Sequence, residues 1–259
     1  MKLKKWALAH YHWIIAGITL LMLFLYGGTA NNFSSLHIKP VSESLGISRT
    51  TFSLIYSIKA IMSMLASYFS GAILKKFGFR HTSSFFLIVA TVSYVALTFM
   101  KSYWIFVIVC FAMGAATSFC GTTGATIIIS SWFQRHRGTV LGFVSAATGL
   151  GGSVMCIAQN AAMERFTWRG SFALCAICCA FVAVLTFLIL RNKPQDIGLV
   201  PYGEGEEITA KKKRISQRAF AGMDMETLRR TPSFYLMVLC TFISCLAVYL
   251  AFNTIPPFL

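Results

Sequence analysis

The sequence predicts an all-helical membrane protein, and three observations support this prediction. Hydrophobic residues make up 56% of the 259 residues and charged residues only 12%, against roughly 25% charged residues in a typical soluble domain. The apolar residues gather in seven stretches, each near the ~20 residues that a helix needs to cross a bilayer. Polar segments that carry most of the Lys and Arg residues separate these stretches. We expect seven transmembrane helices, near residues 13–34, 51–74, 83–100, 103–130, 139–162, 168–190 and 234–258.

The basic residues predict how these helices are oriented. With the N-terminus in the cytoplasm, 17 of the 23 Lys and Arg residues lie in cytoplasmic segments, five lie on the other side, and Lys59 falls inside a span. Cytoplasmic segments of membrane proteins are enriched in Lys and Arg. We therefore expect a multi-pass protein of the inner cell membrane with a cytoplasmic N-terminus. A seven-helix receptor would need the opposite orientation, which disfavours that class.

The same distribution explains the net charge of +15. In a soluble protein such a charge would suggest nucleic acid, but here the expected partner is the lipid bilayer, and no nucleic-acid partner is expected.

The sequence shows no sign of catalytic or metal chemistry. The five His residues are scattered among connections and span ends, and no activated nucleophile is recognisable. Cys175, Cys178 and Cys179 cluster on one stretch, but no His, Asp or Glu accompanies them, so we interpret them as packing residues. We expect no enzyme activity, no catalytic residue, no metal and no cofactor.

A long polar stretch divides the chain into parts. Six apolar stretches follow one another closely, and about 40 residues then separate them from the seventh. We expect a six-helix bundle over 1–191, a cytoplasmic linker over 192–233, and the first helix of an incomplete C-terminal bundle over 234–259. The chain stops within an apolar helix, so we also expect it to be truncated from a protein about twice as long.

The connection after the second stretch has a characteristic pattern of glycines and bases. It reads Gly71-Ala-Ile-Leu-Lys-Lys-Phe-Gly-Phe-Arg-His81 and resembles the signature loop of the major facilitator superfamily. The matching residues, which we predict to form an inner gating loop, are Gly71, Lys76, Gly78 and Arg80. The resemblance implies a tight turn at Gly78 and charges that pair with a neighbouring helix end. Lys75 replaces the family's aspartate, so we expect a weaker gate or a different partner.

Further segments resemble one branch of that superfamily, the oxalate/formate antiporters and monocarboxylate transporters. The cytoplasmic loop after the fourth span contains Arg135 and Arg137 and leads into a glycine-rich fifth span. The other matching segments are Trp168-Arg169, Lys193 to Gly203 and Leu228 to Tyr235. The resemblance implies a bundle of two inverted three-helix repeats plus a seventh helix, taken from a twelve-helix transporter, with a substrate cavity between two bundles.

Lys59 is the residue that best indicates a substrate. It lies roughly 13 Å into the second span, where an ammonium is costly to bury, and Tyr56 and Ser63 share its helix face. We predict that this polar stripe faces a water-filled cavity and that Lys59, Tyr56 and Ser63 bind an anion. The alternative is that Lys59 extends to the membrane surface or pairs structurally with another residue.

Small residues recur every four positions on two spans. They are Gly138, Gly142 and Ala146 on the fifth span, and Thr117, Gly121 and Ala125 on the fourth. Such spacing lets helix backbones approach closely. We predict that both rows are packing seams and not substrate contacts.

These observations predict secondary active transport of a small organic anion, a mono- or dicarboxylate, by alternating access. Because no Asp or Glu falls inside a predicted span, we favour exchange over carboxylate-based proton symport. The alternatives are a transporter of an uncharged solute or drug, and a fragment that is inactive without its C-terminal bundle.

Overall fold

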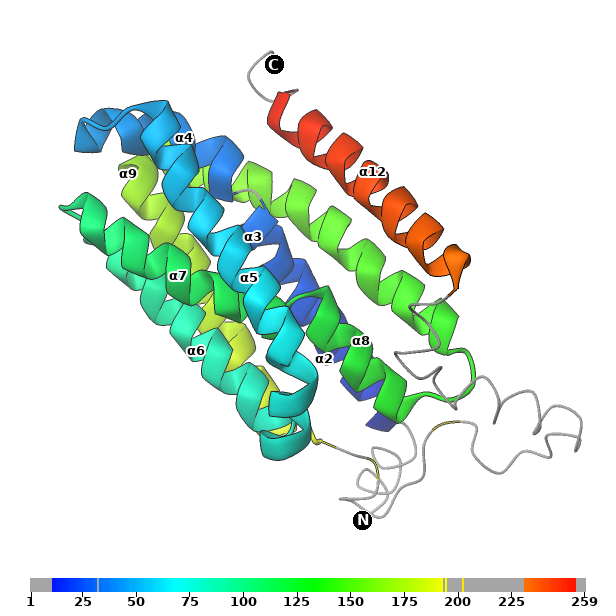
Figure 1. Ribbon diagram of the computed structural model, residues 1–259. Helices are drawn as coiled ribbons and strands as arrows, with labels where there is room; N and C mark the ends of the chain where they lie inside the picture. The colour runs from blue at the N-terminus through cyan, green and yellow to red at the C-terminus, as the bar shows by residue number, and fades with distance from the viewer. Residues whose placement is uncertain (1–10, 32, 193, 195–201, 203–230, 255–259) are drawn as a thin grey trace, which may run out of the picture. The chain divides into compact units, whose positions relative to one another are not determined.

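The computed structural model describes residues 11–31, 33–192, 194, 202 and 231–254. Contacts divide the chain into two units, Met1–Glu204 and Gly205–Leu259. The first unit holds helices α2 to α9, and the second holds α12 (Figure 1). In the described residues, the helices are accompanied only by one isolated bridge between Phe133 and Tyr202. The all-helical prediction is confirmed.

Five helical segments among the described residues are long and apolar enough to cross a membrane. They are Tyr11–Ala30, Arg49–Leu74, Phe79–Thr98, Tyr103–Trp132 and Arg137–Ile189. The last of these, α9 (Arg137–Ile189), has 53 residues and would be about 80 Å long if straight, more than twice the thickness of the hydrocarbon core.

A break inside α9 explains why this helix is longer than a single span. Phe166 and Thr167 have non-helical backbone angles, and Thr167 has a positive φ of 66°. The helix therefore consists of two arms, residues 137–165 and 168–189, which Figure 1 colours green and yellow-green. The first unit thus contains six spans, in agreement with the first six predicted stretches.

The first span is not a uniform α-helix. It runs through α2 (Tyr11–Met22), a π-helical turn η1 (Leu23–Gly27) and α3 (Gly28–Asn31). A Cβ on Gly28 would lie 2.5 Å from the carbonyl oxygen of Gly151, and a Cβ on Gly151 would lie 2.1 Å from that of Phe24. The first span and the fifth-span arm therefore cross backbone against backbone, which only glycine allows at these positions.

This crossing corrects one of the predicted packing seams. A Cβ on Gly138 or Gly142 would meet nothing within 4 Å among the described residues, and Ala146 is exposed. The predicted seam on the fifth span is wrong for this unit, because the contact with the first span lies on the face of Gly151.

The predicted seam on the fourth span is better supported. Ala125 is buried, and the hydroxyl oxygens of Thr117 and Tyr26 lie 3.2 Å apart. This part of the fourth span therefore packs against the first span.

The second and third spans form a hairpin. Between spans one and two, where the sequence suggested a connection, the chain forms helix α4 (Phe33–Leu45). Helix α5 (Arg49–Phe77) then begins at Ser48, whose hydroxyl accepts a hydrogen bond from the Thr51 amide at 3.0 Å. Helix α6 (Phe79–Thr98) follows after a single residue, Gly78.

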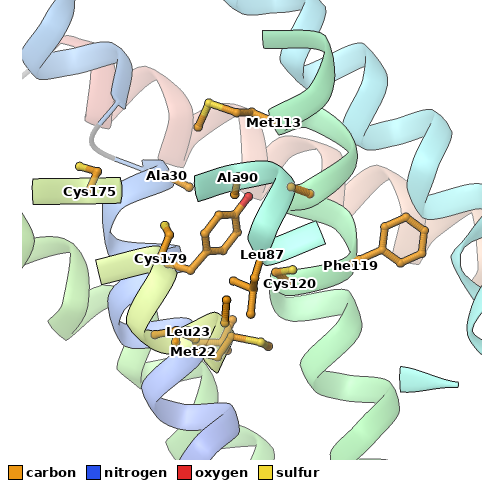
Figure 2. Packing of buried hydrophobic residues seen from close by; sticks show 14 of the residues in the cluster. Met22, Leu23, Ala30, Leu87, Ala90, Met113, Phe119, Cys120, Cys175 and Cys179 are labelled. Atoms are coloured by element: carbon orange, nitrogen blue, oxygen red, sulfur yellow. The ribbon is translucent and has the colours of Figure 1, made fainter. Parts of the chain in front are cut away.

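The fourth span consists of α7 (Tyr103–Cys120) and α8 (Thr122–Trp132), separated at Gly121. Its buried side chains meet those of the first, third and sixth spans in one apolar core. Figure 2 shows this core, with Met22, Leu87, Phe119, Cys120 and Cys179 among its members. Cys110, Cys120, Cys175 and Cys179 are buried, and none of the eight Cys residues forms a disulfide. These four thiols act as the packing groups that the sequence predicted.

The second unit contains α12 (Pro232–Thr254). It covers most of the predicted seventh stretch, 234–258, and begins at a proline, which is favoured in the first turn of a helix. Most of the predicted linker, residues 192–233, lies outside the described residues.

Candidate functional site

Lys59 lies in the first half of α5 and is buried, with 6% of its surface exposed. Its ammonium donates a hydrogen bond of 3.0 Å to the backbone carbonyl of Ala30 and a longer one, 3.5 Å, to the hydroxyl of Tyr56. The ammonium also lies 5.1 Å from the centre of the Tyr56 ring, within the range of a cation–π interaction. The structure therefore brings Lys59 and Tyr56 together, as the sequence predicted, and places the ammonium against the first span.

The acceptor carbonyl is available because the first span ends nearby. Helix α3 stops at Asn31, and the last carbonyls of a helix have no amide partner within that helix. They also carry the negative end of the helix dipole, which attracts a cation. Lys59 thus caps the end of the first span from a neighbouring helix.

A close contact with α7 fixes the position of Lys59. A Cβ on Gly114 would lie 2.5 Å from the backbone oxygen of Lys59 and 2.6 Å from Cβ of Met62. Only glycine lets α5 approach α7 this closely. Gly114 is therefore a residue that supports the site, and the sequence analysis did not single it out.

The polar stripe on α5 divides into two parts. Tyr56 and Ser63 are half-buried, whereas Ser67 forms a 2.9 Å hydrogen bond with Ser118 of α7 and Ser70 is buried. The part beyond Ser63 is therefore packed against α7 and does not line a cavity. Tyr56 and Ser63 keep part of their surface exposed, so a substrate could reach the stripe near these two residues.

The predicted gating loop forms a tight turn. Gly78 ends α5 and begins α6 with a φ of +76°, a conformation that side chains other than glycine's rarely allow. A Cβ at this position would also lie 2.5 Å from the Asn192 amide. The turn at Gly78 is as the sequence predicted.

The partners of Arg80 lie at the end of the sixth span. Its backbone amide donates to the side-chain oxygen of Asn192 at 2.7 Å, and its guanidinium Nε donates to the carbonyl of Phe187 at 2.9 Å. The guanidinium carbon also lies 5.0 Å from the centre of the Phe187 ring. Neutral groups therefore hold the loop at Arg80. No motif in the sequence indicated Asn192.

An open hollow of about 550 Å³ lies beside this loop. It is lined by residues of α5, the loop, α8 and the segment after α9: Gly71, Leu74, Lys76, Phe77, Gly78, Phe79, Ile127, Ile128, Ser131 and Asn192. Gly71, Lys76 and Gly78 therefore line one hollow, whereas the Arg80 side chain contacts the sixth span.

The loop with Arg135 and Arg137 is held by a residue that the sequence analysis did not weigh. The amides of Gln134 and Arg135 both lie 3.1 Å from the carbonyl of Tyr202, and the Tyr202 amide donates to Trp132 at 2.9 Å. The Tyr202 ring also packs against His12 and Trp13 of the first span, at 5.8 and 6.0 Å between ring centres. Arg135 is exposed and Arg137 half-buried. Neither arginine lies close to Lys59 in its position along the spans.

The six spans and the glycine turn between the second and third agree with a known family, whose sequence model matches almost the whole chain. The model of the Major Facilitator Superfamily matches residues 18–259. The chain belongs to the Major Facilitator Superfamily. Members of this family are multi-pass membrane transporters and generally not enzymes. The specific branch suggested by the sequence motifs stays a prediction.

Three curated proteins of this superfamily illustrate the similarity. The chain is 27% identical to the hexuronate transporter of Bacillus subtilis over 60% of its own length and 37% of that protein. It is 25% identical to the probable L-galactonate transporter of Escherichia coli, over 68% of the chain and 40% of the relative. It is 24% identical to the membrane sensor protein UhpC of Salmonella typhimurium, over 62% of the chain and 35% of the relative. The matches thus cover 35% to 40% of the length of these relatives.

Proposed function

We propose that the chain forms one wall of a transporter for a small organic anion and works by alternating access. The observation that carries this proposal is the Lys59 ammonium, which is buried within the bundle and in contact with Tyr56. A buried cation in a transmembrane helix commonly marks a substrate or ion path. The names of two relatives, the hexuronate and L-galactonate transporters, refer to sugar acids, which supports a carboxylate as the recognised group.

The geometry suggests how an anion would bind. The Lys59 contacts described above are hydrogen bonds to uncharged oxygens, and a hydrogen bond between two charged groups is stronger than such a bond. A carboxylate that enters near Tyr56 and Ser63 would displace the Ala30 carbonyl from the ammonium. The Tyr56 hydroxyl would then donate to the second carboxylate oxygen. The flexible four-carbon stem of lysine allows the ammonium to move between these partners.

This exchange of partners would couple binding to movement. When the ammonium leaves Ala30, the end of the first span loses its cap, and the first and second spans are freed to separate at that end. The second bundle expected from the sequence would supply the opposite wall of the cavity. We further propose exchange as the mode of transport, because no span predicted from the sequence contains a carboxylate for a proton relay.

We also propose the orientation that the charges favour, with the N-terminus in the cytoplasm of a cell whose inner membrane holds the protein. The connections at 75–80, 133–137 and 190–192 then lie on the cytoplasmic side, where Lys and Arg are enriched.

Uptake of labelled glucuronate into proteoliposomes that hold the protein with both bundles tests the substrate proposal. We expect Lys59→Ala to lower uptake by about two orders of magnitude, the loss that follows when a buried charged contact worth about 3 kcal/mol is removed. Lys59→Arg should keep part of the activity, because the charge stays while the geometry changes. The control is Lys101→Ala, which removes an exposed ammonium from the turn before α7, where no functional role is assigned, and should leave most of the uptake.

One observation favours a second candidate, an uncharged solute. Lys59 already caps the first span, and that contact is sufficient to explain why a cation occurs there. If both Lys59 variants fold and take up glucuronate as the parent protein does, the anion proposal is refuted. A structural lysine in a carrier of a neutral solute would then be the better interpretation.

A further inference from the structure

The outer faces of α5 and α6 form an apolar groove next to the gating loop. The groove has a volume of about 370 Å³ and is lined by Ile73, Phe77, His81, Thr82, Phe85 and Phe86. Phe77 and Phe85 are 58% and 60% exposed. Four of the six lining residues, Ile73, Phe77, Phe85 and Phe86, are hydrophobic, so the groove favours a hydrocarbon occupant.

The groove lies on a face that is built to contact lipid. Exposed apolar side chains recur every three or four residues along α6, at Phe85, Ile88, Val92, Val95 and Phe99. A helix in a soluble protein would carry polar residues on such a face. This stripe therefore faces hydrocarbon, and the groove at Phe85 opens into the same surroundings.

Basic groups stand at the mouth of the groove. His81 is one of its lining residues and is exposed. The ammonium of Lys76 lies 5.4 Å from the centre of the Phe77 ring, which is a wall of this groove and of the larger hollow beside the loop. Both side chains therefore lie where an apolar wall meets the end of the span.

Among the residues that the structure describes, the charged side chains at this end of the bundle are basic and none is acidic. The acidic residues in the described part of the chain are Glu43, which lies in α4 between the first two spans, and Glu164, which lies near the end of the first α9 arm. Both connections lie at the opposite end of the bundle from Gly78. The sequence also has Lys75 where the signature loop of the family has an acid. This end of the bundle therefore attracts anions, and no carboxylate among the described residues lies there to repel them.

We propose that the cleft between the ends of α5 and α6 is a binding site for an anionic phospholipid. One acyl chain lies in the groove against Ile73, Phe85 and Phe86. The phosphate receives charge-assisted hydrogen bonds from Lys76 and His81 at the groove mouth. Basic sites between helices at a membrane surface are known to select anionic headgroups.

Bound lipid would join the two helices on either side of the Gly78 turn. The same turn contacts Asn192 at the end of the sixth span through Arg80. An occupied groove would therefore hold the loop and the sixth span in one arrangement, which makes this site a place where membrane composition affects the protein.

Native mass spectrometry of the purified chain tests this site. The protein is mixed with equal amounts of phosphatidylglycerol and phosphatidylcholine, and the ratio of the two retained lipids is measured. We expect phosphatidylglycerol to be preferred. Replacing both side chains, Lys76→Gln with His81→Gln, should reduce that preference by about fivefold, the effect of losing the one formal charge of Lys76 near a membrane surface. Lys101→Gln, which removes an exposed cation from the turn before α7, should leave the preference unchanged.

A second pair of variants tests the groove itself. Phe85→Ser removes an apolar wall and should lower the total phospholipid retained, whereas Ile88→Ser changes the next exposed residue of the stripe, outside the groove, and should not. Thermal unfolding of each variant checks that it is folded.

Three outcomes would overturn the proposal. The first is equal retention of the two lipids by the parent protein. The second is an unchanged lipid preference after the Lys76 and His81 substitutions. The third is an equal loss of retained phospholipid in folded Phe85→Ser and folded Ile88→Ser, which would show that the groove does not hold an acyl chain.

Discussion

Two lysines on the same helix show how position along a span determines the role of a side chain. Lys59 is 6% exposed and hydrogen-bonded to the carbonyl of Ala30. Lys76, about 25 Å further along α5, is exposed and lies beside the Phe77 ring. The first ammonium is in a region where losing a partner is costly, and the second is near water and lipid headgroups. Identical groups thus serve a structural or binding role inside the span and an electrostatic role at its end.

The largest expected effect concerns the contact that holds Lys59 in place. Gly114→Leu would push α5 away from α7, because even a Cβ at this position meets the Lys59 backbone. We expect a loss of about 3 kcal/mol or more of folding free energy, the upper range for overpacking, measured by thermal unfolding in detergent. The control is Gly142→Leu, where a Cβ meets nothing within 4 Å. Equal effects of the two substitutions would contradict the described approach of α5 to α7.

The next effect separates the two lysines directly. Lys59→Met leaves the Ala30 carbonyl without its ammonium partner and should cost about 2 kcal/mol, as for other buried hydrogen-bonding groups that lose a partner. Lys76→Met should change stability by less than about 0.5 kcal/mol, as expected for an exposed residue. Unfolding in denaturant measures both variants. If Lys76→Met is the more damaging of the two, the contrast drawn between the two ends of α5 is wrong.

A smaller effect is expected at the turn between α5 and α6. Gly78→Ala places a Cβ on a residue with φ of +76° and against Asn192, which should cost about 1 to 2 kcal/mol. Gly71→Ala, seven residues earlier, meets nothing within 4 Å and should be neutral or slightly stabilising. A shift of the unfolding midpoint with Gly71→Ala but not Gly78→Ala would show that the turn is not as described.

The smallest effect concerns Asn192, the side chain that accepts from the loop at Arg80. Asn192→Ala removes the acceptor of the Arg80 amide, and we expect a cost of about 1 kcal/mol. Asn192→Asp keeps an acceptor and adds a charge near Arg80, so it should be at least as stable as the parent protein. Thermal unfolding of the three proteins checks this order, and a less stable Asp variant would argue against the role assigned to Asn192.

The sequence predicted the spans well because hydrophobic length is a direct requirement of the bilayer. All six spans of the first unit lie within a few residues of the predicted stretches. The π-helical turn at Leu23–Gly27 and helix α4 were not predicted. Both depend on packing between the first span and its neighbours, which composition alone does not reveal.

The predicted packing seam on the fifth span also depended on packing between helices, which the sequence pattern did not reveal. Gly138, Gly142 and Ala146 have the spacing of a seam, but the close approach occurs between Gly28 and Gly151. Small residues on a helix indicate that a close contact is possible, whereas the rotation of the helix in the bundle decides which of them makes it. The spacing rule could not distinguish these two faces of the fifth span.

The candidate site was predicted in part. The free energy needed to bury an ammonium in a span indicated Lys59 as a functional residue. The three-residue spacing on a helix indicated Tyr56 as its neighbour. The Ala30 acceptor, the Gly114 contact and the roles of Asn192 and Tyr202 each depend on residues far apart in the chain. Such pairings come from the fold, and a single sequence has no local pattern that reveals them.

Equilibrium binding of labelled glucuronate to the purified protein tests the central proposal most directly. The account predicts saturable binding by the parent protein and by Lys101→Ala, and no measurable binding by Lys59→Ala that is shown to be folded. Binding that persists in folded Lys59→Ala, or that is lost in Lys101→Ala instead, would contradict the assignment of Lys59 as the anion-binding residue.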